Sequence, residues 1–309
     1  MFLHCSHHPD VFLFYDSCLK AQHRTEEDEV VKIVADTTAG LDPAWVKQHQ
    51  VPYIPQIINF GEESFLELEE ISLQEFLHRL KTGPVMPRTA APPPGRFIQA
   101  FKELDADKNA IICVHPSSEL SGTCRSAQIA KEEAFPNADI RIVDTRTIAG
   151  PLAYLVMRAV EWAEAGVDAD TIVSRLNALI PRMRAYFVVD TLEFLRRGGR
   201  IGGAAALVGE VLQVKPILML RDGRVEAYSR ERTKRRATQR VMDLALEEMS
   251  LDASPCLSIM HSEAPDEAQM MCDYFKQKLG RDDFMVMDLV PAIVTHAGPK
   301  TLAVGFVSK

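Results

Sequence analysis

The stretch IICVHPSSELSGT at residues 111–123, with the segment after it, decides how this chain is expected to fold. Residues 110–114 form a short apolar, partly β-branched run, which is typical of a buried strand. Residues 124–133 are rich in helix formers and contain no Gly or Pro, so a helix should follow. The turn between them carries four hydroxyls and one glycine: Ser117, Ser118, Ser121, Gly122 and Thr123. A helix start of this kind attracts an anion, although simple helix capping explains the same residue types equally well.

Strands and helices alternate on both sides of this stretch. The expected strands cover residues 30–34, 51–60 and 140–143, and the expected helices cover 43–50, 73–80, 96–104 and 152–165. Repeated strand–helix units favour an α/β fold with a doubly wound, mostly parallel sheet. The first strand ends in Asp36-Thr37-Thr38, at the edge where such sheets bind ligands, although Asp36 equally suits a turn cap. The proline-rich segment 88–95 predicts a stiff, extended loop that holds Thr89.

The pattern changes from residue 168 onward. The expected helices cover 169–179, 233–249 and 265–279, and the expected strands cover 185–189, 214–220, 225–229, 257–261, 284–289 and 302–307. Asp222-Gly223 is a hairpin signal, and the Gly- and Arg-rich residues 196–203 predict a flexible, cationic loop. We therefore expect an N-terminal α/β domain at 30–167, a smaller α+β domain at 168–290 and a C-terminal segment at 291–309.

The bulk composition narrows the class of protein. The chain has 309 residues, 47% of them hydrophobic and 25% charged, which suits a globular protein with a sizeable core. A net charge of −8 without a long basic stripe argues against nucleic-acid binding, and no apolar run is long enough to span a bilayer. The six cysteines are scattered, which favours reduced thiols and a cytoplasmic location.

Residues 1–29 do not resemble the rest of the chain, and we expect a leader or extension outside the fold. His4, His7 and His8 have side chains that ligate metals, but no partner cluster is evident, so no metal site is expected. The segment lacks the basic start and small-residue cleavage site of a signal peptide.

Several motifs follow one another along residues 30–309. They are DTT (36–38), Thr89 with the proline run to Gly95, SSELSGT (117–123), Val143-Asp144, DTLEFL with GGRIG (190–202), KPI (215–217) and HAGP (296–299). In this order they resemble the DegV family of bacterial fatty-acid-binding proteins.

The resemblance implies that one long-chain fatty acid lies between the two domains, and that residues 291–309 return to the ligand site. It implies that Thr89 and Ser121 hold the carboxylate with His296 nearby, supported by Ser118, Gly122 and Thr123. Such proteins look like non-catalytic carriers that present the carboxylate to a separate ATP-dependent fatty-acid kinase. The acyl phosphate would feed phospholipid synthesis, with no cofactor and at most transient membrane contact. Arg200 matches the family motif and would contact the kinase or a phosphate.

Elementary physical chemistry agrees with these roles. A carboxylate removed from water needs hydrogen-bond donors, because an unpaired buried charge is very costly. Two hydroxyls, one of them at a helix start, and an imidazole supply such donors. Each buried methylene of the tail contributes ~0.8 kcal/mol, so affinity should come from the tail and orientation from the head group.

Two other classes of function were weighed. A hydrolase or transferase using Ser121 and His296 is the alternative, but no G-x-S-x-G elbow and no orienting Asp is evident. A nucleotide-binding regulator is disfavoured, because the chain lacks the expected phosphate-binding loop.

The chain departs from the family pattern at Ala90-Ala91 and at Lys300. The Lys300 side chain would either add a head-group contact or face solvent. Fatty-acid length and saturation preference and oligomeric state are not encoded in any readable motif.

Overall fold

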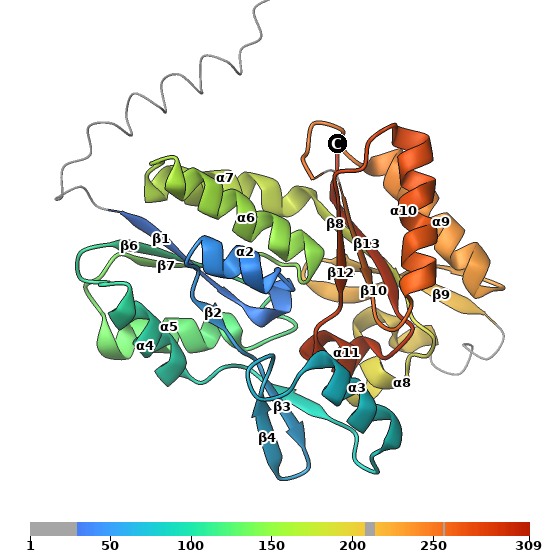
Figure 1. Ribbon diagram of the computed structural model, residues 1–309, viewed down its shortest axis with the longest axis horizontal. Helices are drawn as coiled ribbons and strands as arrows, with labels where there is room; N and C mark the ends of the chain where they lie inside the picture. Colours follow the sequence, from blue (N-terminus) through green and yellow to red (C-terminus); the bar gives the residue numbers. More distant parts are fainter. Residues whose placement is uncertain (1–29, 208–213, 256) are drawn as a thin grey trace, which may run out of the picture.

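The computed structural model describes residues 30–207, 214–255 and 257–309, which form two neighbouring layered regions (Figure 1). The expected leader at 1–29 and the histidines at positions 4, 7 and 8 lie outside the described residues. Of the helices described, none combines the length and the apolar character that a membrane crossing requires.

The first region is built on a four-stranded parallel sheet, as the sequence predicts. Its strands are β1 (Val31–Asp36), β2 (Tyr53–Ile54), β6 (Ala110–His115) and β7 (Ile140–Asp144), in the order β2-β1-β6-β7. Every residue of β6 is buried because alternate side chains enter cores on opposite faces of the sheet. The helices α4 (Pro94–Glu103) and α5 (Thr123–Ala134) cover one face, and α6 (Gly150–Glu164) and α7 (Ala169–Leu179) cover the other. The short α2 (Pro43–Gln48) follows β1.

The second region is built on a six-stranded mixed sheet, in the order β10-β9-β8-β13-β11-β12. The strands are β8 (Met183–Val188), β9 (Lys215–Arg221), β10 (Arg224–Glu231), β11 (Leu257–His261), β12 (Phe284–Asp288) and β13 (Leu302–Val307). The helices α9 (Lys234–Glu248) and α10 (Pro265–Leu279) cover its outer face, while α6 packs between the two sheets. A Cβ on Gly150, the first residue of α6, would lie 2.1 Å from Ser258 Oγ of β11, so this position tolerates no side chain.

A three-stranded antiparallel sheet, β4-β3-β5, corrects two expectations. The single strand expected at 51–60 is wrong: Pro55 separates β2 of the parallel sheet from β3 (Ile57–Phe60), which pairs with β4 (Glu63–Leu66). Thr89 lies on the short edge strand β5 (Arg88–Ala90) rather than in a loop. Pro87 precedes this strand and the proline run 92–94 follows it, so no proline interrupts its pairing with β3. The helix α3 (Leu73–Thr82) follows β4.

The Gly- and Arg-rich segment is also more regular than expected. A flexible loop is predicted at residues 196–203, but its first two residues end α8 (Glu193–Arg197) and its last two begin a 3-10 helix at Gly202–Leu207. Arg196 and Arg197 both form ion pairs with Glu193, which fixes them along α8. His296 lies on α11 (Pro291–Ala297), a short helix that the sequence analysis did not predict.

The domain boundaries expected from the sequence remain predictions. Residues 169–179, placed in the second domain by the sequence, form α7, which packs against α6 and β6 of the first region. We therefore propose that the division follows α7. The C-terminal segment at 291–309 supplies α11 and β13, the latter in the interior of the six-stranded sheet.

Candidate ligand cavity

A cavity lies between the carboxyl edge of the parallel sheet and the inner face of the six-stranded sheet. Its empty volume is about 960 Å³ including the open mouth. The wall is mainly apolar, with side chains that include Ile148, Phe187, Leu220, Met260, Ile293 and Ala303. The polar side chains of the wall are Thr38, Gln56, Thr89, Ser121, Arg200, His296 and Thr301. A long apolar molecule with one polar end matches this distribution.

Thr89 and His296, which are far apart in the sequence, meet in the wall of this cavity. The Oγ1 atom of Thr89 lies 2.9 Å from Nε2 of His296. Burial of the imidazole, with a smaller effect from the Arg200 charge, lowers the pKa of His296 to about 4. The ring is therefore neutral at pH 7. Its Nδ1 atom is buried and has no hydrogen-bond partner among the described residues, and it faces Gly198.

Ser121 reaches the same wall from the turn before α5. Its Oγ atom lies 2.8 Å from Oγ1 of Thr123 and accepts the backbone N–H of Thr123 at 3.3 Å. Gly122 occupies the N-cap position, so the expected capping role falls on the preceding serine. A Cβ on Gly122 would lie 3.4 Å from Cβ of Ala91, so this turn packs directly against the segment that carries Thr89.

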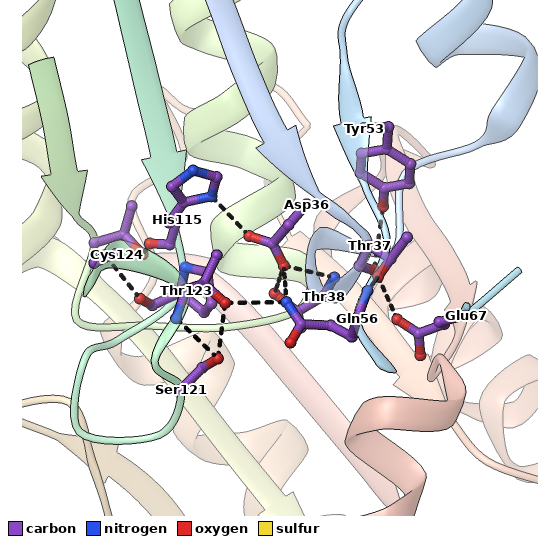
Figure 2. A network of polar contacts seen from close by, with 12 residues as sticks. Asp36, Thr37, Thr38, Tyr53, Gln56, Glu67, His115, Ser121, Thr123 and Cys124 are labelled. Atoms are coloured by element: carbon purple, nitrogen blue, oxygen red, sulfur yellow. Dashed lines mark hydrogen bonds and ion pairs between the residues drawn. The ribbon is translucent and has the colours of Figure 1, made fainter. Parts of the chain in front are cut away.

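A buried polar network continues from Ser121 into the parallel sheet (Figure 2). Nε2 of Gln56 lies 3.0 Å from Thr123 Oγ1 and 3.0 Å from Asp36 Oδ1. Asp36 Oδ1 also accepts the backbone N–H and hydroxyl of Thr38, and Asp36 Oδ2 lies 2.9 Å from Nδ1 of His115. The sequence analysis singled out Asp36 as a polar residue at this edge but missed Gln56, which follows a strand too short to recognise.

Glu67 connects this network to the helix that carries His296. The side chain is fully buried; Oε2 accepts the hydroxyl of Thr37, and Oε1 accepts the backbone N–H of Ala292 on α11 at 2.5 Å. Burial raises the pKa of Glu67 to about 7, against the lowering effect of these two hydrogen bonds. The sequence analysis did not identify Glu67, because its neighbours Glu69 and Glu70 give the segment the composition of an ordinary acidic surface turn.

The remaining predicted residues have different surroundings. Thr123 lies behind Ser121 and does not reach the cavity wall, while Ser118 donates to Asp144 at 2.5 Å, also away from the wall. The guanidinium of Arg200 lines the cavity, and its Nε and Nη1 donate to the carbonyls of Leu120 and Gly198. Lys300 is exposed and outside the wall, which favours the solvent-facing alternative.

Comparison with known proteins gives relatives for nearly the whole described chain. The family model described as "Uncharacterised protein, DegV family" matches residues 30–309. The DegV domain-containing protein YteA of Lactococcus lactis is 34% identical over 284 residues, covering 90% of this chain and 98% of YteA. The DegV domain-containing protein SCO2569 of Streptomyces coelicolor is 35% identical over 277 residues, covering 89% of this chain and 97% of SCO2569.

Solved structures share the same fold. A fatty-acid-binding DegV family protein from Thermus thermophilus superposes with a TM-score of 0.80 and 28% identity, covering 91% of this chain and 100% of that protein. DegV of Bacillus subtilis, a fatty-acid-binding protein, superposes with a TM-score of 0.81 and 27% identity, with the same coverage.

Fold and cavity together define an α/β protein with a mainly apolar cavity between two sheets. The chain belongs to the DegV family, in agreement with the motif order along its sequence.

Proposed function

We propose that this protein binds a long-chain fatty acid in the cavity, with the carboxylate at Thr89, Ser121 and His296. The observation that carries the proposal is that these three residues, from three separate segments, line the same mainly apolar cavity. Relatives with the same fold from Thermus thermophilus and Bacillus subtilis are fatty-acid-binding proteins.

The charge near the proposed carboxylate position favours an anionic ligand. Arg200 lines the same wall and its charge lowers the pKa of His296, so this positive charge acts on the part of the cavity around His296. A carboxylate there would gain electrostatic attraction as well as hydrogen bonds from hydroxyl groups. The apolar remainder of the cavity would bury the tail, at ~0.8 kcal/mol per methylene.

The geometry gives less support to the alternative of a hydrolase or transferase. Within the described part of the chain, His296 is hydrogen-bonded to Thr89, while Ser121 is hydrogen-bonded to Thr123. A serine nucleophile needs a base within hydrogen-bond reach, and this pairing directs the imidazole to a different hydroxyl.

Lipid extraction tests the binding proposal. Protein purified from a bacterial host should release a long-chain fatty acid, close to equimolar, measured by mass spectrometry of the denatured sample. Ser121→Ala and Thr89→Val should each weaken binding of added palmitate about tenfold or more, since each removes a hydrogen bond to a charged group. Ser126→Ala, on α5 but outside the cavity wall, serves as the matched control. Unchanged affinity in both head-group variants would refute the assignment.

We further propose that the bound acid is presented to a separate fatty-acid kinase, giving an acyl phosphate for phospholipid synthesis, and that Arg200 contributes to this contact. The support is the DegV motif around Arg200 and the exposed cations Arg196 and Arg197 on the adjoining helix. Because Arg200 also lines the cavity, the comparison is made at a palmitate concentration that saturates both proteins, where Arg200→Ala should lower acyl-phosphate formation with the cognate kinase and ATP. Full turnover by the variant would remove Arg200 from the partner contact.

A further inference from the structure

The buried network behind Ser121 has a fixed hydrogen-bond direction. Asp36 Oδ1 accepts the backbone N–H of Thr38, so this oxygen is an acceptor. The Gln56 side-chain atom 3.0 Å from it must therefore be the amide nitrogen, which can only donate. The acceptor Asp36 therefore determines that the amide nitrogen of Gln56, and not its oxygen, faces it.

The donor role of Gln56 also sets the direction of the hydrogen bonds at Thr123 and Ser121, which lie between Gln56 and the cavity. The same amide nitrogen lies 3.0 Å from Thr123 Oγ1, so Thr123 accepts there and keeps its own hydroxyl hydrogen for another partner. Ser121 Oγ, at 2.8 Å, is the acceptor available for that hydrogen, and it also takes the Thr123 backbone N–H. Both lone pairs of the Ser121 oxygen are thus occupied. Its one remaining hydrogen-bonding capacity is its own hydrogen, which is available to the cavity that it lines.

Two other serines of the same turn provide an internal contrast. The hydroxyl of Ser117 donates to the carbonyl of Gly223 at 2.8 Å, and the hydroxyl of Ser118 donates to Asp144. Their hydrogens are used within the protein, whereas the hydrogen of Ser121, once Thr123 donates to this oxygen, has no other acceptor among the described residues. The supporting residues Asp36, Gln56 and Thr123 are at most 3% exposed, so water does not compete for these bonds.

We propose that Asp36, Gln56 and Thr123 are positioning residues that make Ser121 an obligate hydrogen-bond donor, and that the cavity thereby selects carboxylates over alcohols of equal chain length. The inference rests on the proposed fatty-acid function. It names the head-group property that the site distinguishes, namely whether the head group must donate a hydrogen bond. A carboxylate only accepts hydrogen bonds and matches a wall whose serine can only donate. An alcohol must also place its own hydrogen, and this serine offers no lone pair for it.

Gln56→Glu tests the direction without changing the side-chain volume. Beside Asp36 in a buried site, the new carboxyl is expected to be protonated, with its single hydrogen donated to Asp36. Its oxygen then accepts from Thr123, and Thr123 accepts from Ser121. Ser121 still accepts the backbone N–H of Thr123, and its second lone pair becomes available to the cavity. Competition binding of palmitate and hexadecan-1-ol should show the acid-to-alcohol affinity ratio falling about tenfold or more relative to the wild type.

Thr123→Val and Thr123→Ser form a matched pair for the same measurement. The valine removes the hydroxyl that connects Gln56 to Ser121 and should lower the acid-to-alcohol ratio, whereas the serine keeps the hydroxyl and should preserve it. The ¹³C carboxyl signal of bound [1-¹³C]palmitate adds a readout that general destabilisation would not move. The bound acid should titrate at higher pH in Gln56→Glu and Thr123→Val than in the wild type and Thr123→Ser.

The possible outcomes separate the two proposals. Wild-type protein that binds neither ligand refutes the fatty-acid function itself. If the wild type binds palmitate, equal weakening of acid and alcohol in Gln56→Glu, or an unchanged ratio in both variants, refutes the positioning role alone. Should Gln56→Glu fail to fold, the Thr123 pair decides the question.

Discussion

Two sides of the cavity wall, one around Ser121 and one around His296, are held in different ways. Ser121 is the last member of a buried network whose bonds reach back through Gln56 to Asp36 in the parallel sheet. His296 has one hydrogen bond, to Thr89, and its second ring nitrogen has no partner within the described residues. The Ser121 side is therefore oriented before any ligand arrives, while the His296 side depends on β5, α8 and α11 staying packed together.

Glu67 is the connection between the two sides, and changing it should have the largest effect. It accepts from Thr37, the neighbour of Asp36, and from the backbone N–H of Ala292 at the start of the helix that carries His296. Its pKa is raised from 4.5 to about 7 by burial, so between these pH values the folded protein binds a proton that the unfolded chain has released. Stability should therefore fall as pH rises from 4.5 to about 7, by on the order of 3 kcal/mol at most.

The variant Glu67→Gln removes the titrating group and retains an amide oxygen for Ala292. The pH dependence of its free energy of unfolding, measured by urea denaturation, should lose this decline. His296 contributes the opposite slope, because its lowered pKa costs stability as pH falls from 6.5 toward 4. The comparison is therefore variant against wild type at each pH. Parallel curves across pH 5–7 would contradict the role given to Glu67.

The next largest effect is expected at Gly198, whose Cα lies against the His296 ring. A Cβ there would lie 2.0 Å from Nδ1 of His296 and 3.1 Å from the carbonyl oxygen of Phe194. Gly198→Ala should displace the imidazole from Thr89, destabilise the protein by about 1–3 kcal/mol and weaken palmitate binding. Gly95→Ala is the matched control, since a Cβ at Gly95 meets nothing within 4 Å.

The measurement for this pair is the free energy of unfolding together with palmitate affinity. Wild-type palmitate affinity in Gly198→Ala would mean that Ser121 and Thr89 hold the carboxylate and that the position of the imidazole does not affect binding. Such a result would sharpen the contrast between the two sides rather than leave them equivalent.

Sequence reasoning predicted best where local pattern and tertiary environment agree. The strand at 110–114 and the helix after it were expected correctly, because a fully buried parallel strand reads as a continuous apolar run. The strand expected at 51–60 was wrong because Pro55 divides it between two sheets, which hydrophobicity alone does not reveal. β5 and α11 were missed because each is short and stabilised by distant partners.

The residues of the candidate site were likewise predictable only where a motif marked them. Thr89, Ser121 and His296 were named together only through the resemblance to a family, because no spacing rule connects residues from three distant segments. Gln56 and Glu67 carried no motif in the sequence analysis. Their roles depend on which chain segments meet behind the cavity wall, and this becomes visible only when hydrogen-bond partners across the fold are known.

The smallest expected effect concerns Lys300, which follows α11 on the His296 side. Its backbone has φ +60°, in the left-handed region that favours glycine. Lys300→Gly should relieve that strain, while the added freedom of the unfolded chain offsets part of the gain, leaving about 0.5 kcal/mol of stabilisation. Because the side chain is exposed and outside the cavity wall, palmitate affinity should not change. A loss of affinity in Lys300→Gly, with Lys300→Ala behaving alike, would instead give the ammonium group a part in holding the carboxylate.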